Sequence, residues 1–225
     1  MKKTAILLLF LYVFLNPLYA ASENLLSGGN GMWSVKIGAG KSFSNSSYKD
    51  ATTDTNSCES GIIACDIDDS DTTFHIGVER LLNDYLSIGL QYERLGDIYY
   101  VNSATSAEKL KQNTSVISVN LMASYDISAN FSPFAEIGAG HYRSKAKYSS
   151  ATTRLSDSSS GISALFGLGM KYKYDSNWGM HIGWRKYQKT GEKQRMLGSG
   201  APVPTYIKTL DAKVESTYIS LSYTF

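Results

Sequence analysis

The chain has 225 residues, of which 22 are Lys or Arg, 20 are Asp or Glu, and 43% are hydrophobic. Two of the basic residues, Lys2 and Lys3, lie in the first twenty residues. The remaining chain, 21–225, has 20 basic and 20 acidic residues and so no formal net charge. This balance lacks the basic footprint of a nucleic-acid-binding protein, and we expect no nucleic-acid partner.

The first twenty residues have the layout of a secretory signal peptide. Two lysines precede the apolar run from Ala5 to Leu15, and Ala20 is followed by another alanine. The sequence therefore predicts a cleaved signal peptide over 1–20 and a mature domain over 21–225. After residue 20 no apolar run approaches the roughly 18 residues of a membrane helix, so any membrane contact must be made by strands.

Cys58 and Cys65 are the two cysteines, and in an exported chain such a pair predicts one local disulfide. A zinc site is not expected, because no histidine lies near them. A bound calcium ion is the weaker alternative to a solvated acidic loop, since Asp71 and Gly77 stand where a helix-loop-helix calcium loop needs glycine and glutamate. The acidic positions in question are Asp66, Asp68, Asp69 and Asp71. We expect no metal and no cofactor.

Apolar and polar residues alternate with period two in eight segments, which is typical of strands with two different faces. The segments are 33–40, 74–79, 86–93, 117–125, 133–140, 162–172, 178–185 and 216–225. Short Asn-, Asp- and Ser-rich connections follow the second, fourth and sixth segments, at 83–84, 126–130 and 175–177. The other connections, 44–72, 94–115, 142–160 and 186–213, are long and polar.

This arrangement predicts an all-β fold, an eight-stranded antiparallel up-and-down transmembrane β-barrel with periplasmic turns and termini and long extracellular loops. A secreted soluble barrel of the lipocalin type is the alternative. We favour the transmembrane barrel over the soluble one because aromatic residues occur at the ends of the apolar rows, and because glycines and charged residues occur together in the polar rows. The predicted girdle comprises Trp33, Tyr92, Tyr125, Tyr172, Trp184 and Tyr223.

The polar rows predict a charged network inside the barrel. Its members are Lys36, His75, Glu79, Glu93, Glu136, Lys171, His181 and Arg185. An eight-stranded barrel is just filled by side chains, and unpaired buried ions are costly, so the three glutamates should pair with the three cations. We therefore expect a closed lumen, with a small or regulated pore as the alternative.

The chain ends on alternating apolar residues, Ile219, Leu221, Tyr223 and Phe225, which predicts a closing strand whose last side chain faces lipid. This end resembles the C-terminal insertion signal that the barrel assembly machinery reads in outer-membrane barrels.

The segments NFSPFAEIGAGHYRSKAK and YDSNWGMHIGWRKYQ resemble strand signatures of the OmpA-like and opacity-type small outer-membrane β-barrels. The resemblance covers essentially the mature chain. It implies a Gram-negative integral outer-membrane protein, acting through surface loops as an adhesin or surface antigen, or supporting the envelope structurally. No peptidoglycan-binding domain follows Phe225, so a role in anchoring the cell wall is not expected. We also expect a monomer.

Enzymatic activity is not expected, although some small barrels modify lipid A with a serine, a histidine and a carboxylate. His75 and His141 are predicted near the outer rim and His181 nearer the periplasmic end. The chain contains no nucleophile elbow. A lipid A-modifying enzyme remains the alternative, and we expect no catalytic residues.

The loops carry opposite charges. Loop 44–72 has seven acidic residues and one lysine, whereas loop 186–213 has six basic and two acidic residues, so we expect attraction across the mouth. Two independently mobile loops are the alternative. Loop 142–160 is basic, with Arg143, Lys145 and Lys147, and is predicted to meet lipopolysaccharide phosphates or, less readily, a host surface or matrix ligand. Apolar positions in the loops are either strand extensions or partner contacts: Tyr99, Tyr100, Tyr206 and Ile207.

Overall fold

The computed structural model describes residues 32–45, 49–50, 65–68, 70–83, 85–102, 109–150, 152–191, 195–199, 204–207, 209 and 212–225. The signal peptide and Cys58, and with it the predicted disulfide, lie outside the described residues. So does Asp69 of the acidic segment.

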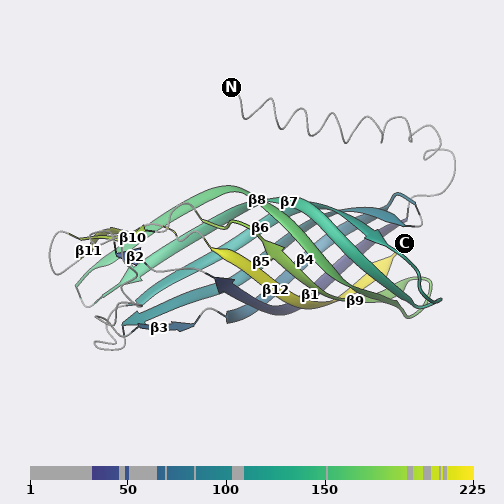
Figure 1. Cartoon of the computed structure of the whole chain (residues 1–225), viewed down its shortest axis with the longest axis horizontal. Helices are drawn as coiled ribbons and strands as arrows, with labels where there is room; N and C mark the ends of the chain where they lie inside the picture. The colour runs from purple at the N-terminus through teal and green to yellow at the C-terminus, as the bar shows by residue number, and fades with distance from the viewer. Residues whose placement is uncertain are drawn as a thin grey trace, which may run out of the picture.

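Eight long strands form a closed antiparallel barrel (Figure 1). They are β1 (Trp33–Asn45), β4 (Ser70–Leu81), β5 (Leu86–Asn102), β6 (Lys109–Ser124), β7 (Phe131–Ser149), β8 (Arg154–Lys173), β9 (Trp178–Tyr187) and β12 (Lys213–Thr224). Each pairs with its neighbours in sequence order, which confirms the predicted fold class. Among the described residues, no helix is long and apolar enough to cross a membrane.

The barrel closes between its first and last strands, where Val35 pairs with Tyr223. The seam continues to the final residue, because the Phe225 backbone N–H donates to the Trp33 carbonyl at 2.9 Å and the Trp33 N–H donates back at 3.3 Å. The Phe225 side chain is 68% exposed on the outer surface. The backbone of Phe225 is thus held in the ladder while its side chain faces outward.

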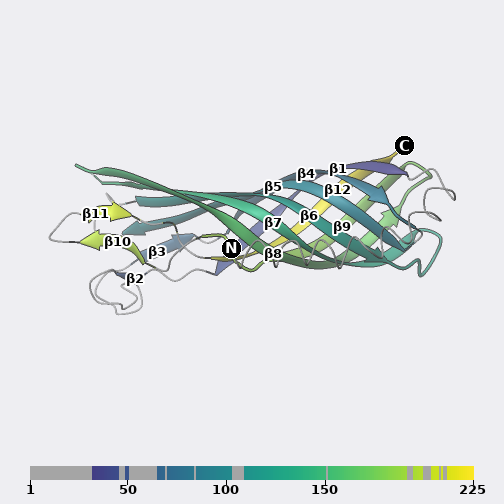
Figure 2. The same cartoon turned by 90° about the horizontal axis from the view of Figure 1, so that it is seen from above.

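Three tight turns lie at the end of the barrel that carries Phe225, and we name this the turn end; the opposite one is the loop end (Figures 1 and 2). Asn83 Oδ1 accepts the backbone N–H groups of Tyr85 and Leu86 at 2.9 and 2.8 Å. Asp175 Oδ1 accepts those of Asn177 and Trp178 at 2.8 and 2.7 Å. Such side-chain caps explain why Asn and Asp mark these turns in the sequence.

Two of the predicted loops are largely strand. β5 runs on to Asn102 and β6 begins at Lys109, while β7 reaches Ser149 and β8 begins at Arg154, so the predicted boundaries 94–115 and 142–160 are wrong. The alternation of buried and exposed residues continues through β7, but its outer row changes from apolar to polar beyond the middle of the strand. The loss of outer apolar residues therefore resembles the end of a strand in the sequence, although the strand continues.

β5 contains a bulge where it separates from β4. Its register with β6 shifts between Arg94 and Asp97, and Gly96 has a φ of 81°, which glycine adopts without strain. The Asp97 N–H donates to Asp71 Oδ2 at 2.8 Å, so an aspartate side chain replaces the missing ladder bond.

Four short strands lie toward the loop end: β2 (Lys49–Asp50), β3 (Cys65–Asp68), β10 (Arg195–Ser199) and β11 (Pro204–Ile207). β3 extends the ladder of β5, and β10 pairs with β11 and, in parallel, with β2. The backbones of the acidic and basic loops therefore meet. Attraction between their charges stays a prediction.

Candidate functional site

The structure places all eight residues of the predicted polar network on the inner side of the barrel wall, in two clusters. The lower cluster, near the turn end, contains Lys36, Glu79 and Lys171, with His181 close by. Glu79 binds both lysines: Lys36 forms an ion pair with Oε2, and Lys171 Nζ lies 3.2 Å from Oε1. Two cations thus share one carboxylate.

The upper cluster is centred on Arg185, which binds two glutamates. Its Nη1 lies 2.9 Å from Glu93 Oε2, and its Nε lies 2.7 Å from Glu136 Oε1. All three side chains are at most 1% exposed. Because a buried charge without a partner is strongly destabilising, this arrangement requires all three groups together.

Two tyrosines that were not predicted as members of the network complete the upper cluster. Tyr187 Oη donates to Glu93 Oε2 at 2.8 Å, and the Arg185 guanidinium lies 4.5 Å from the centre of the Tyr218 ring. Tyr218 occurs in the polar row of the closing strand, which was the available signal. Tyr187 ends β9, two residues beyond the segment predicted from the sequence.

Described residues of the connection between β9 and β12 pack into the loop end of the lumen. Thr190 and Thr209 are fully buried there. Tyr142 Oη donates to the Gly191 carbonyl at 3.0 Å, and Thr209 Oγ1 donates to Ser159 Oγ at 2.6 Å. An apolar cluster lies below them, with Leu95, Val116, Tyr142, Leu165 and Val214 among its members. Side chains from several strands thus fill the barrel, as its small radius predicts.

His75 and His141, both predicted near the outer rim, do not share a site. His75 lies in the lumen, as predicted for the polar network, where it is 1% exposed and edge-on to Tyr218 at 4.9 Å between ring centres. His141 is exposed on the outer surface of β7. The two side chains point to opposite sides of the wall because of their row positions. His181 lies in the lumen near the turn end.

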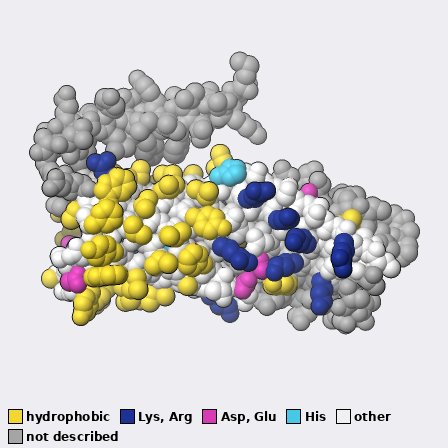
Figure 3. All heavy atoms as spheres, turned by 180° about the vertical axis from the view of Figure 1, so that it is seen from behind, with side chains coloured by type: hydrophobic (Ala, Val, Ile, Leu, Met, Phe, Trp, Pro, Cys, Tyr) yellow, Lys and Arg dark blue, Asp and Glu magenta, His cyan; other side chains and the backbone are white. Residues whose placement is uncertain are grey.

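The outer surface divides into an apolar belt and a basic face. Hydrophobic side chains cover the turn-end part of the face in Figure 3, and Lys and Arg side chains follow toward the loop end. Exposed apolar residues on β6 to β8 include Ile117, Ile137, Ile162 and Leu168. The predicted girdle residues Trp33, Tyr92, Tyr125 and Tyr223 are also exposed. Such a surface suits lipid rather than water.

The basic face begins where the belt ends. His141 pairs with Ile117 and Ile162, and the next outward residue, Arg143, pairs with Ser115 and Ser160. The basic face comprises Arg143, Lys145 and Lys147 on β7, Lys109 and Lys111 on β6, and Arg154 on β8. All are exposed except Lys111, which is partly buried. The three β7 residues were predicted in a loop, but they lie on a strand.

Lys111 has an acidic partner at the edge of the basic face. Its Nζ lies 2.6 Å from Asp97 Oδ2 and donates to Tyr99 Oη at 2.8 Å. Burial alone would raise the pKa of Asp97, but hydrogen bonds from Lys111 and Asn113 outweigh it and hold the pKa below its ordinary 3.8. Tyr99 is thus part of a strand extension. Of Tyr100, Tyr206 and Ile207 the structure describes the backbone alone, in β5 and β11.

Comparison with known proteins agrees with this architecture. A family model for the outer membrane protein beta-barrel domain matches residues 8–225. The chain belongs to this outer-membrane β-barrel family. Its location is therefore the outer membrane.

The matched relatives are similar in fold and distant in sequence. Outer membrane protein A of Serratia marcescens is 28% identical over 112 residues, which are 49% of this chain and 30% of that relative. Ail of Yersinia pestis, solved in complex with the heparin analogue sucrose octasulfate, aligns with a TM-score of 0.50 and 18% identity, covering 88% of this chain and 100% of Ail. OprG of Pseudomonas aeruginosa aligns with a TM-score of 0.53 and 12% identity, covering 87% and 96%.

Proposed function

We propose that the chain is a surface-interaction protein of the adhesin type, which binds anionic sugar polymers through its basic face. In this proposal the signal peptide is removed, the turns and termini are periplasmic, the loop end is outside the cell, and the protein is a monomer delivered by the barrel assembly machinery. The basic face is the observation that carries the proposal.

The β7 bases are evenly spaced along one strand. Alternate residues of a strand lie about 6.6 to 6.8 Å apart, so Arg143, Lys145 and Lys147 form a straight column of positive charge. Ser160, Ser158 and Ser156 pair with them from β8, in that order. A row of cations beside a row of hydroxyl groups is suited to repeated phosphate or sulfate groups.

Apart from Lys111, which binds Asp97, the members of the basic face make no ion pair with an acidic residue among the described residues. Lys147 pairs directly with Lys111, and like charges at opposed positions destabilise a sheet. The outward positions of β7 and β8 beyond the belt contain no acidic residue in the described strands. A bound polyanion would relieve this repulsion. The Ail complex with a heparin analogue supports the same ligand chemistry on this fold.

Binding of the purified protein to immobilised heparin and to lipopolysaccharide tests the proposal. The triple variant Arg143→Gln, Lys145→Gln, Lys147→Gln should lose at least about tenfold in affinity, since charged hydrogen bonds contribute about 1.5–3 kcal/mol each. The matched control Lys41→Gln, Arg80→Gln, Lys213→Gln removes the same charge from other positions and should bind almost normally. Equal loss in both triples would refute a specific site. Preference for lipopolysaccharide would identify the anion as the neighbouring lipid.

A purely structural role in the envelope is the second candidate, and the buried side chains that fill the lumen support it over a pore. Deleting the gene and measuring adhesion, leakiness and lipid A composition together separates these roles. Leakiness with unchanged adhesion would support the structural role, and altered lipid A would support the enzyme that the sequence analysis left as an alternative.

A further inference from the structure

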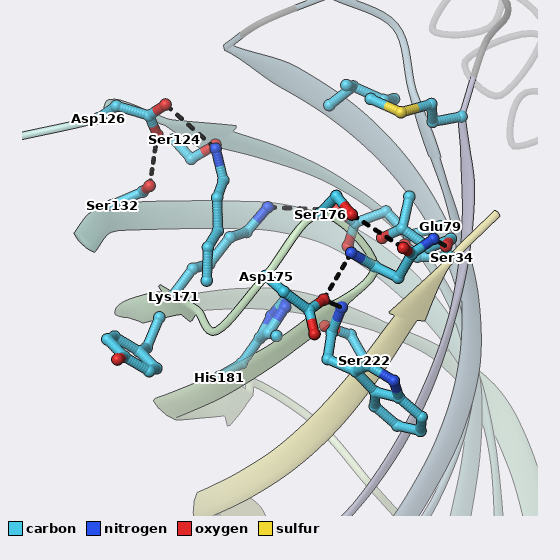
Figure 4. A pocket seen from close by; sticks show the side chains of 18 residues that line it. Ser34, Glu79, Ser124, Asp126, Ser132, Lys171, Asp175, Ser176, His181 and Ser222 are labelled. Carbon is cyan, nitrogen blue, oxygen red and sulfur yellow. Dashed lines mark hydrogen bonds and ion pairs between the residues drawn. The ribbon is translucent and has the colours of Figure 1, made fainter. Parts of the chain in front are cut away.

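A cavity of about 430 Å³ lies at the turn end, and Figure 4 shows the side chains around it. Its lysines already have carboxylate partners: Lys171 binds Glu79 at 3.2 Å, and Lys173 binds Asp126 at 3.1 Å. These charges neutralise each other, so they offer a ligand in the cavity no net positive charge. The basic face differs from the cavity, because most of its cations have no acidic partner among the described residues.

Five cations of the basic face make no ion pair in the part of the chain that the structure describes. Three follow β7, and two flank the next outward position of that strand, because Ser149 pairs with Lys109 on one side and with Arg154 on the other. Ser149 lies six residues beyond Arg143, which is about 20 Å along a strand. We name these five residues the β7 track: Arg143, Lys145, Lys147, Lys109 and Arg154.

Asp97 holds two other cations on the β5 side of the basic face. Its Oδ2 lies 2.6 Å from Lys111 Nζ and 3.5 Å from Arg94 Nη2, and its Oδ1 accepts a hydrogen bond from Asn113 at 2.6 Å. The Asp97 side chain is only 6% exposed, so these partners largely shield its carboxylate from water. Two cations and one carboxylate leave this group a net charge of +1, whereas the β7 track carries +5.

The position of Asp97 is level with the middle of the β7 track. Asp97 pairs with Asn113 on β6, and Asn113 pairs with Lys145 on β7. Because neighbouring strands lie about 4.8 Å apart, the backbones of Asp97 and Lys145 are about 9.6 Å apart. An anionic chain that crossed the sheet from β7 to β5 would pass over the carboxylate. A chain that follows β7 stays two strands away from it.

We propose that Asp97 determines how the ligand lies on the basic face. Asp97 neutralises Lys111 and repels anions from β5, so a linear anionic sugar chain binds lengthwise along the β7 track and covers about 20 Å of it. A compact anion contacts only part of the track and binds more weakly. This assignment rests on the proposed binding of anionic sugar polymers, and it names the shape of the ligand and the residue that selects it.

Heparin binding by the purified protein in lipid nanodiscs tests the role of Asp97. Asp97→Asn keeps the shape of the side chain and removes its charge, so affinity should rise about two- to fivefold. Adding Lys111→Gln should remove most of this gain, because the released lysine provides it. The matched control is Glu215→Gln, since Glu215 binds Lys186 on β12 and β9, away from the basic face, and this variant should bind as wild type does.

The sign of the change separates selection from a structural role, because loss of a merely structural aspartate would weaken binding. Gel mobility before and after boiling shows whether each variant is folded. A folded Asp97→Asn variant that binds no more tightly than wild type overturns the proposal, and so does an equal gain in Glu215→Gln. If Asp97→Asn does not fold, single variants decide: Lys145→Gln should weaken binding at least about threefold and Lys111→Gln less than about twofold, and equal losses overturn the proposal.

Heparin oligosaccharides of increasing length test the lengthwise arrangement. Affinity should rise until the oligosaccharide covers about 20 Å and then level off. The double variant Lys109→Gln, Arg154→Gln removes the far end of the β7 track, so its affinity should level off at a shorter length. A flat series, or the same series in the double variant, overturns the lengthwise arrangement. Absence of all heparin binding by the wild type refutes the proposed function itself, so the two failures are distinguishable.

Discussion

Replacing Arg185 with methionine removes the cation that two buried glutamates share. The guanidinium lies 2.9 Å from Glu93 and 2.7 Å from Glu136, and neither carboxylate is exposed. Methionine retains much of the side-chain volume, so the main loss is electrostatic. Removing one partner of a buried ion pair costs about 3–5 kcal/mol, and we expect the free energy of unfolding to fall by that amount.

The loss of Arg185 should affect Glu93 and Glu136 to different extents. Glu93 keeps hydrogen bonds from Tyr187 at 2.8 Å and Ser216 at 3.0 Å, whereas Glu136 keeps one from Asn120 at 2.6 Å. Adding Glu136→Gln to Arg185→Met should therefore restore about 1–3 kcal/mol. The sign of this second change distinguishes loss of charge pairing from loss of packing.

Urea unfolding of the protein folded in lipid vesicles provides the measurement, with gel mobility before and after boiling as the measure of folding. Lys186→Met is the matched control, because Lys186 pairs with Glu215 on the outer surface, where their side chains are 24% and 40% exposed. An exposed pair contributes about 0–1 kcal/mol. A free energy of unfolding for Arg185→Met within about 1 kcal/mol of the wild-type value would contradict this prediction. Further destabilisation of the Arg185→Met variant by Glu136→Gln would also contradict it.

Three further predictions concern other parts of the barrel. Gly96→Val should destabilise the protein by about 1–3 kcal/mol in the same urea assay, because Gly96 has a φ of 81° and an added Cβ would lie 2.7 Å from Asp71 Cβ. An unchanged unfolding midpoint would show that the bulge accepts a side chain at this position. Asp97→Asn should lower the free energy of unfolding at neutral pH. Because the pKa of Asp97 in the folded protein lies below 3.8, the ionised side chain stabilises the fold fully above that pH, and this stabilisation disappears as the pH falls through the lowered pKa. Unfolding curves of wild type and Asp97→Asn should therefore converge in acid, and a constant difference would exclude Asp97 as the cause. Planar-bilayer recordings should give no steady single-channel currents, because side chains fill the lumen, and such currents would show that solutes pass through it.

The strand pattern was readable from the sequence because lipid and a filled lumen impose opposite demands on alternate residues. Ile137 and Glu136 differ by one position and face different surroundings, so period two indicates both the strand and its orientation. This signal fails in the upper parts of β5 to β8. There the outer row is polar, and the strands resemble loops in composition.

The sequence predicts that charges pair inside the lumen, but not which residues pair with each other. The charge types predict that three glutamates meet three cations, but Arg185 and Glu93 are 92 residues apart, and their contact depends on barrel closure and register. The residues that cover the lumen at the loop end have no periodic signal, because Thr190 and Thr209 lie outside the strands. The cavity at the turn end could not be predicted from the sequence either, since it depends on the positions of side chains from seven strands.

Quenching of tryptophan fluorescence tests the central claim that the apolar rows face lipid. Three tryptophans, Trp33, Trp178 and Trp184, all lie in outward rows, and the first two are 44% and 50% exposed. In vesicles whose lipids carry bromine on their acyl chains, we predict strong quenching, with little additional quenching by iodide in the buffer. Emission that bromine-labelled lipid leaves unchanged and iodide quenches fully would contradict the account.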